Sequence, residues 1–120
     1  KDVIDYNIAL YGQSGAATVV YEAIEAATAI GSTTTILELT KTTTDGSAAG
    51  LVSALGSSAT NSTIDSGDKI LIANYTSGGD AQIWLFTDAS GADVAASELD
   101  LLITLENVTA DSLTTDNFLA

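Results

Sequence analysis

Residues 69–87 have the sequence KILIANYT-SGGD-AQIWLFT, and this stretch carries the clearest structural signal in the chain. Apolar side chains recur at every second position in both halves, which is the period of a β-strand. The central Ser77-Gly78-Gly79-Asp80 has the glycines that favour a tight turn. The stretch therefore predicts an antiparallel hairpin with strands at 69–76 and 81–87. Because both faces of these strands are apolar, either the sheet is covered on both sides or one face contacts another subunit.

Outward from this hairpin, the same alternation predicts further strands near 99–106, 33–40 and 3–11. Residues 17–25 have mixed propensities, because β-branched residues are followed by Glu and Ala. We expect a strand there that runs into a helical turn.

One helix is predicted, near 47–55. Four apolar residues share one helical stripe, at spacings of three and four residues: Ala48, Leu51, Val52 and Leu55. Asp45 or Ser47 is the candidate N-cap, and Gly56 stands where helices often end. The sequence thus predicts an α+β, β-rich fold dominated by an antiparallel sheet, in a single domain over residues 1–120.

The composition excludes several classes of function. The chain has 16 Asp and Glu residues against three Lys and Arg, giving a formal net charge of −13, and it has no His and no Cys. Such a surface repels nucleic acid and favours cations. No apolar run is long enough to cross a membrane, so we expect no membrane insertion. Without His or Cys no Ser-His or Cys-His pair can form. We therefore expect that the protein is not an enzyme.

The segment Thr87–Leu99 is a candidate calcium loop. Calcium prefers six to eight oxygen ligands, and this loop offers four oxygen-bearing side chains: Asp88, Ser90, Asp93 and Glu98. The spacing departs from the EF-hand pattern, because Ala92 replaces a ligand and Asp93 replaces a glycine. The alternative is a solvated acidic loop in which Ser97 caps a short turn.

Two other motifs admit two interpretations each. Asn61, Asn74 and Asn107 begin Asn-x-Ser/Thr triplets, which are glycosylation acceptors or chance occurrences in a Thr-rich chain. Trp84 and Phe86 are either core residues, which is the simpler interpretation, or a platform on which a carbohydrate stacks.

The last third of the chain resembles a known family. It resembles the bluetail domain, found at the C-terminus of large RTX-type, calcium-binding bacterial surface proteins. The resemblance covers about residues 67–120 and depends on the motifs Gly67-Asp68-Lys69-Ile70-Leu71-Ile72, Trp84-Leu85-Phe86-Thr87-Asp88, Ser97-Glu98-Leu99, Leu102-Ile103-Thr104-Leu105 and Leu113-Thr114-Thr115-Asp116-Asn117-Phe118. The opening Asp2-Val3-Ile4-Asp5-Tyr6 is similar to the start of such modules.

The resemblance implies export by a type I secretion machinery and calcium-rich surroundings. It places an uncleaved secretion signal at the C-terminus, ending in Asp116, Asn117, Phe118, Leu119 and Ala120. The glycine- and aspartate-rich repeats of calcium-binding β-rolls are absent from the chain.

These observations lead to two hypotheses. The first is a non-enzymatic extracellular structural protein that self-assembles into a filament or surface layer. The second is a calcium-responsive secretion and folding module that belongs to a larger adhesin or exoenzyme. Both place the protein outside the cell or on its surface.

Overall fold

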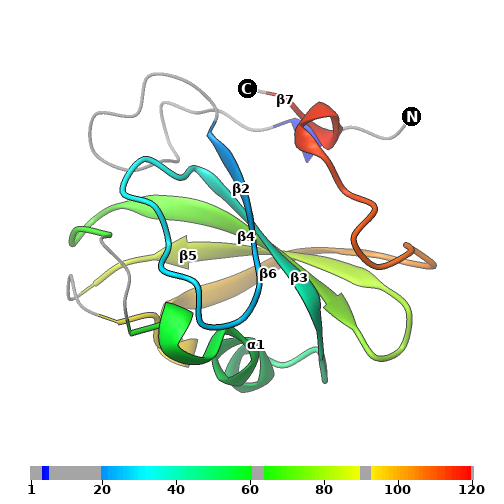
Figure 1. The fold of residues 1–120 in the computed structure, drawn as a ribbon, viewed down its shortest axis with the longest axis horizontal. Helices are drawn as coiled ribbons and strands as arrows, with labels where there is room; N and C mark the ends of the chain where they lie inside the picture. Colours follow the sequence, from blue (N-terminus) through cyan, green and yellow to red (C-terminus); the bar gives the residue numbers. More distant parts are fainter. Residues whose placement is uncertain (1–3, 6–19, 61–63, 90–92, 120) are drawn as a thin grey trace.

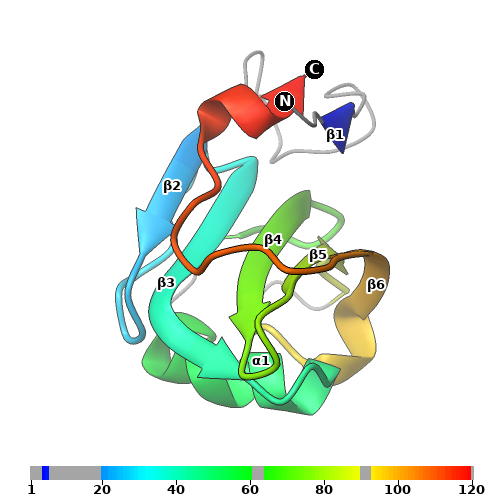
Figure 2. The same cartoon turned by 90° about the vertical axis from the view of Figure 1, so that its right-hand side faces the viewer.

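The computed structural model describes residues 4–5, 20–60, 64–89 and 93–119. They form a five-stranded sheet with one helix on one face and a C-terminal segment across the other (Figures 1 and 2). In chain order the elements are β1 (Ile4–Asp5), β2 (Tyr21–Ile24), β3 (Ile36–Thr44), α1 (Ala48–Leu55), β4 (Lys69–Thr76), β5 (Ala81–Thr87), β6 (Leu99–Leu105) and β7 (Phe118–Leu119). Short 3₁₀ turns lie at Gly56–Ser58, Ala96–Glu98 and Thr115–Asn117.

The predicted α+β, β-rich class with one helix is confirmed. The sheet has the order β2-β3-β4-β5-β6 and is mixed. Antiparallel pairing holds for β4, β5 and β6, whereas β2, β3 and β4 run parallel to one another. The expectation of an antiparallel sheet is therefore wrong for β2 and β3. The physical reason is that two connections return the chain to the same end of the sheet: residues 25–35 between β2 and β3, and the crossover through α1 between β3 and β4.

The predicted element bounds agree best where the sequence signal is local. The hairpin strands have the predicted limits, and α1 begins one residue after its N-cap Ser47. The strand expected at 33–40 extends instead from Ile36 to Thr44, and the strand expected at 99–106 ends at Leu105. Of the strand expected at 3–11, Ile4–Asp5 is strand, and the other positions lie outside the described residues. Of the region 17–25, residues 17–19 lie outside the described residues, and strand β2 occupies Tyr21–Ile24. A turn closed by the Thr28 N–H and the Glu25 carbonyl follows, but it is not helical, because Ala27 has a φ of 71°.

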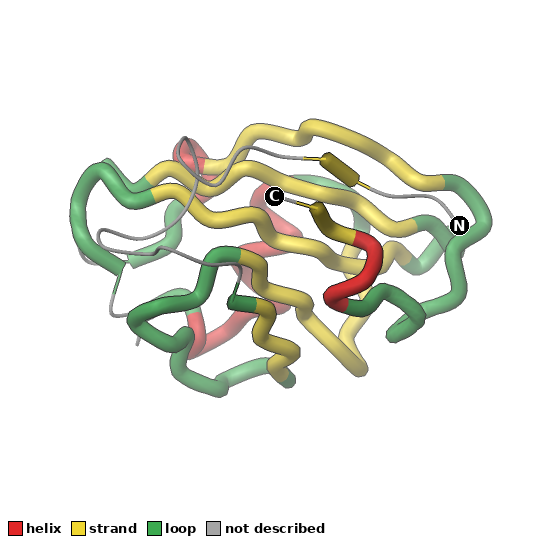
Figure 3. Tube along the Cα trace, turned by 90° about the horizontal axis from the view of Figure 1, so that it is seen from above, coloured by secondary structure: helices red, strands yellow, loops and turns green. Residues whose placement is uncertain are grey.

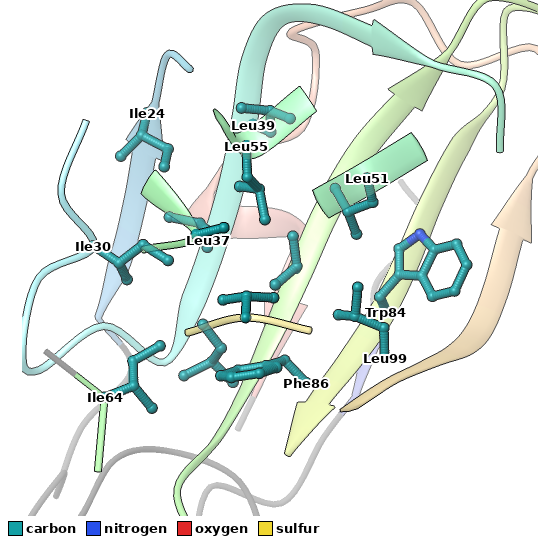
Figure 4. Packing of buried hydrophobic residues seen from close by; sticks show 14 residues of the cluster. Ile24, Ile30, Leu37, Leu39, Leu51, Leu55, Ile64, Trp84, Phe86 and Leu99 are labelled. Carbon is teal, nitrogen blue, oxygen red and sulfur yellow. The ribbon is translucent and has the colours of Figure 1, made fainter. Parts of the chain in front are cut away.

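The face of the sheet that carries α1 holds the larger core (Figure 4). The helix buries Leu51 and Leu55 completely against side chains of β3, β4 and β5. The Ser47 hydroxyl accepts a hydrogen bond from the Gly50 N–H at 2.9 Å, which caps the helix. Burying these leucines stabilises the fold by about 1.5–3 kcal/mol each.

The opposite face is also covered. After β6 the chain crosses this face toward β2 (Figure 2). Leu113 and Phe118 from this segment pack on Ile36, Leu71 and Ile83 of the sheet, among others. Beyond the crossing, β7 pairs in parallel with β1 near both termini, on the side of the molecule opposite α1 (Figures 1 and 3). The apolar character of both faces of β4 and β5 is thus explained by two covering layers within one chain.

Candidate functional site

In the acidic loop after β5, the Glu98 carboxylate accepts hydrogen bonds from the backbone of the same loop. Glu98 Oε1 accepts a hydrogen bond from the Ala89 N–H, and Oε2 accepts one from the Ala95 N–H, both at 3.0 Å. Asp88 is buried at the end of β5, and Asp93 is exposed. Ser90 lies outside the described residues. The hydrogen bonds of Glu98 hold the two ends of the loop together.

The sequence interpretation missed a second acidic loop beside the first. The Asp88 N–H donates to the Asp68 carbonyl at 3.0 Å, and the Gly67 N–H donates to the Asp88 carbonyl at 2.8 Å. The Asp68 carboxylate is buried and accepts from the Asp65 N–H at 3.2 Å. Asp68 precedes β4 and Asp88 follows β5, so antiparallel pairing brings them together. Their symmetric placement around the predicted hairpin is the sequence signal that could have identified this neighbourhood.

The described residues contain no group of three or more Asp, Glu, His or Cys side chains arranged to hold a metal ion. The calcium site at Asp88, Ser90, Asp93 and Glu98 therefore stays a prediction. What the geometry provides is a pair of neighbouring acidic loops joined by backbone hydrogen bonds.

The predicted secretion signal is part of the folded domain. Phe118 is buried, and its ring lies 6.0 Å from that of Tyr21, centroid to centroid. Asn117 Oδ1 accepts a hydrogen bond from the Thr114 N–H at 2.9 Å, whereas Asp116 is exposed. Leu119 belongs to β7, and Ala120 lies outside the described residues. This tail thus contributes to the core, whatever it contributes to export.

A buried carboxylate fastens the C-terminal segment to the sheet. Glu38 on β3 is 4% exposed and accepts hydrogen bonds from two tyrosines, Tyr21 and Tyr75, one on each carboxylate oxygen. The Tyr75 hydroxyl also accepts from the Leu113 N–H at 3.1 Å, and the Tyr21 hydroxyl oxygen lies 3.2 Å from the Leu113 carbonyl oxygen. Burial, reinforced by the bonds to Glu38, raises the pKa of both tyrosine hydroxyls. The network joins β2, β3 and β4 to the segment that covers them.

Trp84 is a core residue. It is 5% exposed, and its Nε1–H donates to Asn74 Oδ1 at 2.8 Å. Asn74 is also buried and donates through Nδ2 to Thr44 Oγ1 at 2.7 Å. The core interpretation of Trp84 is therefore correct, and the carbohydrate platform is wrong. In the folded domain the Asn74 side chain is inaccessible to a glycan.

Strand β6 forms an apolar edge of the sheet. Within the described part of the chain it pairs only with β5. Its centre carries three consecutive large apolar side chains that are exposed by 46%, 47% and 38%: Leu101, Leu102 and Ile103. A register shift opposite Ile83 and Trp84 makes Leu102 an extra residue. Leu101 and Ile103, which would share a face in a regular strand, therefore lie beside Trp84 and Ile83 on opposite faces of the sheet. The alternating pattern found this strand, but it did not show that the strand lies at an edge.

The site and the fold together define a class: an acidic α+β domain with a mixed sheet, an apolar edge and two neighbouring acidic loops. No family model, curated protein or solved structure matches the chain. Among the helices of the described residues, none combines the length and the apolar character needed to cross a bilayer.

Proposed function

We propose that this protein is a non-enzymatic, extracellular structural protein that self-associates into a filament or surface layer. The observation that carries the proposal is the β6 edge. Exposed apolar side chains on an edge strand are a site for pairing with another chain, and soluble proteins usually protect such edges. Three of them in succession favour an association surface.

The extracellular assignment has a different basis. The resemblance of residues 67–120 to bluetail-type modules supports delivery by type I secretion. The acidic surface supports the proposal that the protein works in surroundings rich in cations, because cations reduce the repulsion among its 16 carboxylates.

The test of assembly is sedimentation and negative-stain microscopy of the purified protein over a range of concentrations. We expect species larger than the monomer that grow with protein concentration and with added calcium or salt. A strictly monomeric protein at high concentration with calcium present would contradict the proposal.

The second candidate is the calcium-responsive secretion and folding module of a larger protein. It is favoured by the two neighbouring acidic loops around Asp68 and Asp88 and by the resemblance of the C-terminus to a secretion signal. Deleting the tail is a poor test, because it also removes the buried Phe118. Fusing Asp111–Ala120 to an unrelated passenger separates the two roles. Export of the fusion by a type I machinery supports the signal, and retention of the fusion excludes it.

A further inference from the structure

We infer that the C-terminal segment, residues 106–119, exchanges between copies: it leaves its own sheet and covers the same face of a second copy. The inference rests on the proposed function, because it concerns how copies of this chain associate, and it adds a contact distinct from the β6 edge. The surface that receives the segment is the sheet face that carries Ile36, Leu71 and Ile83.

The fit between this face and the segment is present within one chain. Leu113 and Phe118 are buried and pack with the apolar side chains of the face. The Leu113 N–H donates to the Tyr75 hydroxyl at 3.1 Å, and the Phe118 ring lies 6.0 Å from the Tyr21 ring, centroid to centroid. These contacts join the segment to the sheet and do not involve the connection between them, so the same contacts form when the segment comes from a second copy.

The segment detaches without disturbing the larger core. That core lies on the face with α1, and its last residue in chain order is Leu99. Between described residues, no backbone-to-backbone hydrogen bond joins residues 106–117 to the five-stranded sheet, whose face they cross (Figure 2). The segment is held by side-chain atoms instead, such as Asp111 Oδ1, which accepts from the Lys41 N–H at 3.2 Å. Opening of such a segment is a local event that costs less free energy than global unfolding.

The connection to β6 is an exposed turn at residues 106–107. Asn107 has a φ of 57°, in the left-handed region, and its N–H donates to Asp80 Oδ1 at 3.0 Å. Asn tolerates this conformation better than most residues other than Gly, yet an extended backbone remains the less strained state. An extended Asn107 therefore relieves strain and directs the chain away from its own sheet.

Protein concentration decides between the closed and the exchanged forms. Both forms contain the same contacts between segment and sheet, so they differ mainly in the turn and in the freedom lost on association. A segment on a short connection has an effective concentration on the order of millimolar at its own face. Exchange therefore competes where the copies themselves are that concentrated, as they are within a filament or surface layer.

Cross-linking between two single-cysteine variants tests the exchange, because the chain has no cysteine of its own. Lys41 and Asp111 are exposed neighbours, one on the sheet and the other on the segment. Lys41→Cys with a heavy-nitrogen label is mixed with unlabelled Asp111→Cys at a concentration on the order of 1 mM, and a short bis-maleimide then joins neighbouring thiols. In the control mixture, Ser53→Cys on α1, at the opposite face, replaces Lys41→Cys.

The masses of the covalent dimers report the result. We expect heterodimers of Lys41→Cys with Asp111→Cys in excess of their statistical share, because only an exchanged segment brings these two thiols together. The control mixture should show the statistical share, since random collisions join thiols without regard to position.

Two substitutions in the turn shift the equilibrium without altering the contacts of the segment. Asn107→Val disfavours the left-handed turn and should raise the association constant, measured by sedimentation equilibrium, at least about tenfold. Asn107→Gly favours the turn and should lower that constant. If Asn107 had a structural role alone, Asn107→Val would unfold more easily with no gain in association.

The outcomes distinguish this inference from the proposed function. Larger species that form without an excess of heterodimers, or whose formation does not respond to Asn107→Val, would overturn the exchange and leave self-association standing. A monomer at every concentration, for both the parent and Asn107→Val, would overturn the exchange and the proposed function together.

Discussion

At the scale of single residues, Glu38 shows how a buried charge fixes the arrangement of neighbouring segments. Removing one partner of a buried carboxylate leaves it incompletely satisfied, which costs more than the bond itself contributes. The Tyr75 hydroxyl donates to Glu38 at 2.5 Å and accepts from the Leu113 N–H. Tyr75 is therefore the residue through which β4 holds the C-terminal segment.

Tyr75→Phe should lower the free energy of unfolding by about 1–3 kcal/mol, because it deprives Glu38 and the Leu113 N–H of their partner at once. Urea denaturation monitored by circular dichroism measures this change. Tyr21→Phe is the matched control: Tyr21 is half-buried, so its loss should cost less. An equal or larger cost for Tyr21→Phe would show that the connection to Leu113 through Tyr75 contributes little.

The same two hydroxyls predict a response to alkaline pH. Burial and the bonds to Glu38 raise the pKa of both above the ordinary value of 10.0. In the unfolded chain they ionise near pH 10, while in the folded chain they keep their protons. The unfolded state therefore binds fewer protons above about pH 10, and the free energy of unfolding falls as the pH rises. Below about pH 10 this contribution is complete.

The measurement is the urea midpoint at several pH values between about 8 and 11. We expect a decline that begins near pH 10 and that is shallower in the Tyr21→Phe, Tyr75→Phe double variant. An unchanged slope in the double variant would assign the decline to other groups.

At the scale of elements, α1 depends on its N-terminal cap. The Ser47 hydroxyl accepts from the Gly50 N–H and donates to Asp45 Oδ1 at 2.7 Å. The hydrogen bonds that Asp45 Oδ1 accepts from the Ser47 hydroxyl and the Ser47 N–H hold the pKa of Asp45 below its usual range. The helix has eight residues, so it has little intrinsic stability to compensate for a lost cap.

Ser47→Ala should therefore cost about 1 kcal/mol. Thermal or urea unfolding provides the measurement. Ser53→Ala, in the exposed part of the same helix, should change stability by less than about 0.5 kcal/mol, because alanine is the better helix former. Equal effects of the two substitutions would mean that the cap is unimportant.

Elements defined by local signals could be predicted from the sequence. The hairpin of β4 and β5 follows from alternation around two glycines, and α1 follows from four apolar positions and a capping serine. The parallel pairing of β2 and β3 could not be predicted, because strand order depends on contacts between distant parts of the chain. For the same reason, the alternating pattern predicts β6 as a strand but does not predict that it lies at an edge.

The acidic loop also shows that local spacing can be read from the sequence, whereas contacts between distant residues cannot. The spacing predicts Asp88, Ser90, Asp93 and Glu98 as calcium ligands, yet the structure uses both carboxylate oxygens of Glu98 to hold backbone N–H groups. The neighbouring Asp68 was missed because the antiparallel pairing of β4 and β5 brings it there, and the spacing within one loop carries no such information.

At the scale of the whole molecule, a net charge of −13 in one small chain opposes the compact state. Cations screen this repulsion, so the melting temperature should rise with added sodium chloride. A calcium salt at matched ionic strength distinguishes screening from binding, because screening alone gives equal shifts in the two salts. Differential scanning calorimetry measures both, and a flat response to either salt would show that the charges are too dispersed to matter.

Two charge-removing substitutions locate any additional effect of calcium. Asp93→Asn and Glu106→Gln each remove one exposed carboxylate, the first inside the acidic loop and the second outside it. Both should respond equally to sodium chloride. If the loop binds calcium, the additional rise in melting temperature should be lost in Asp93→Asn and kept in Glu106→Gln. Loss in both variants, or in neither, would exclude Asp93 as a ligand and leave screening as the way in which cations stabilise this domain.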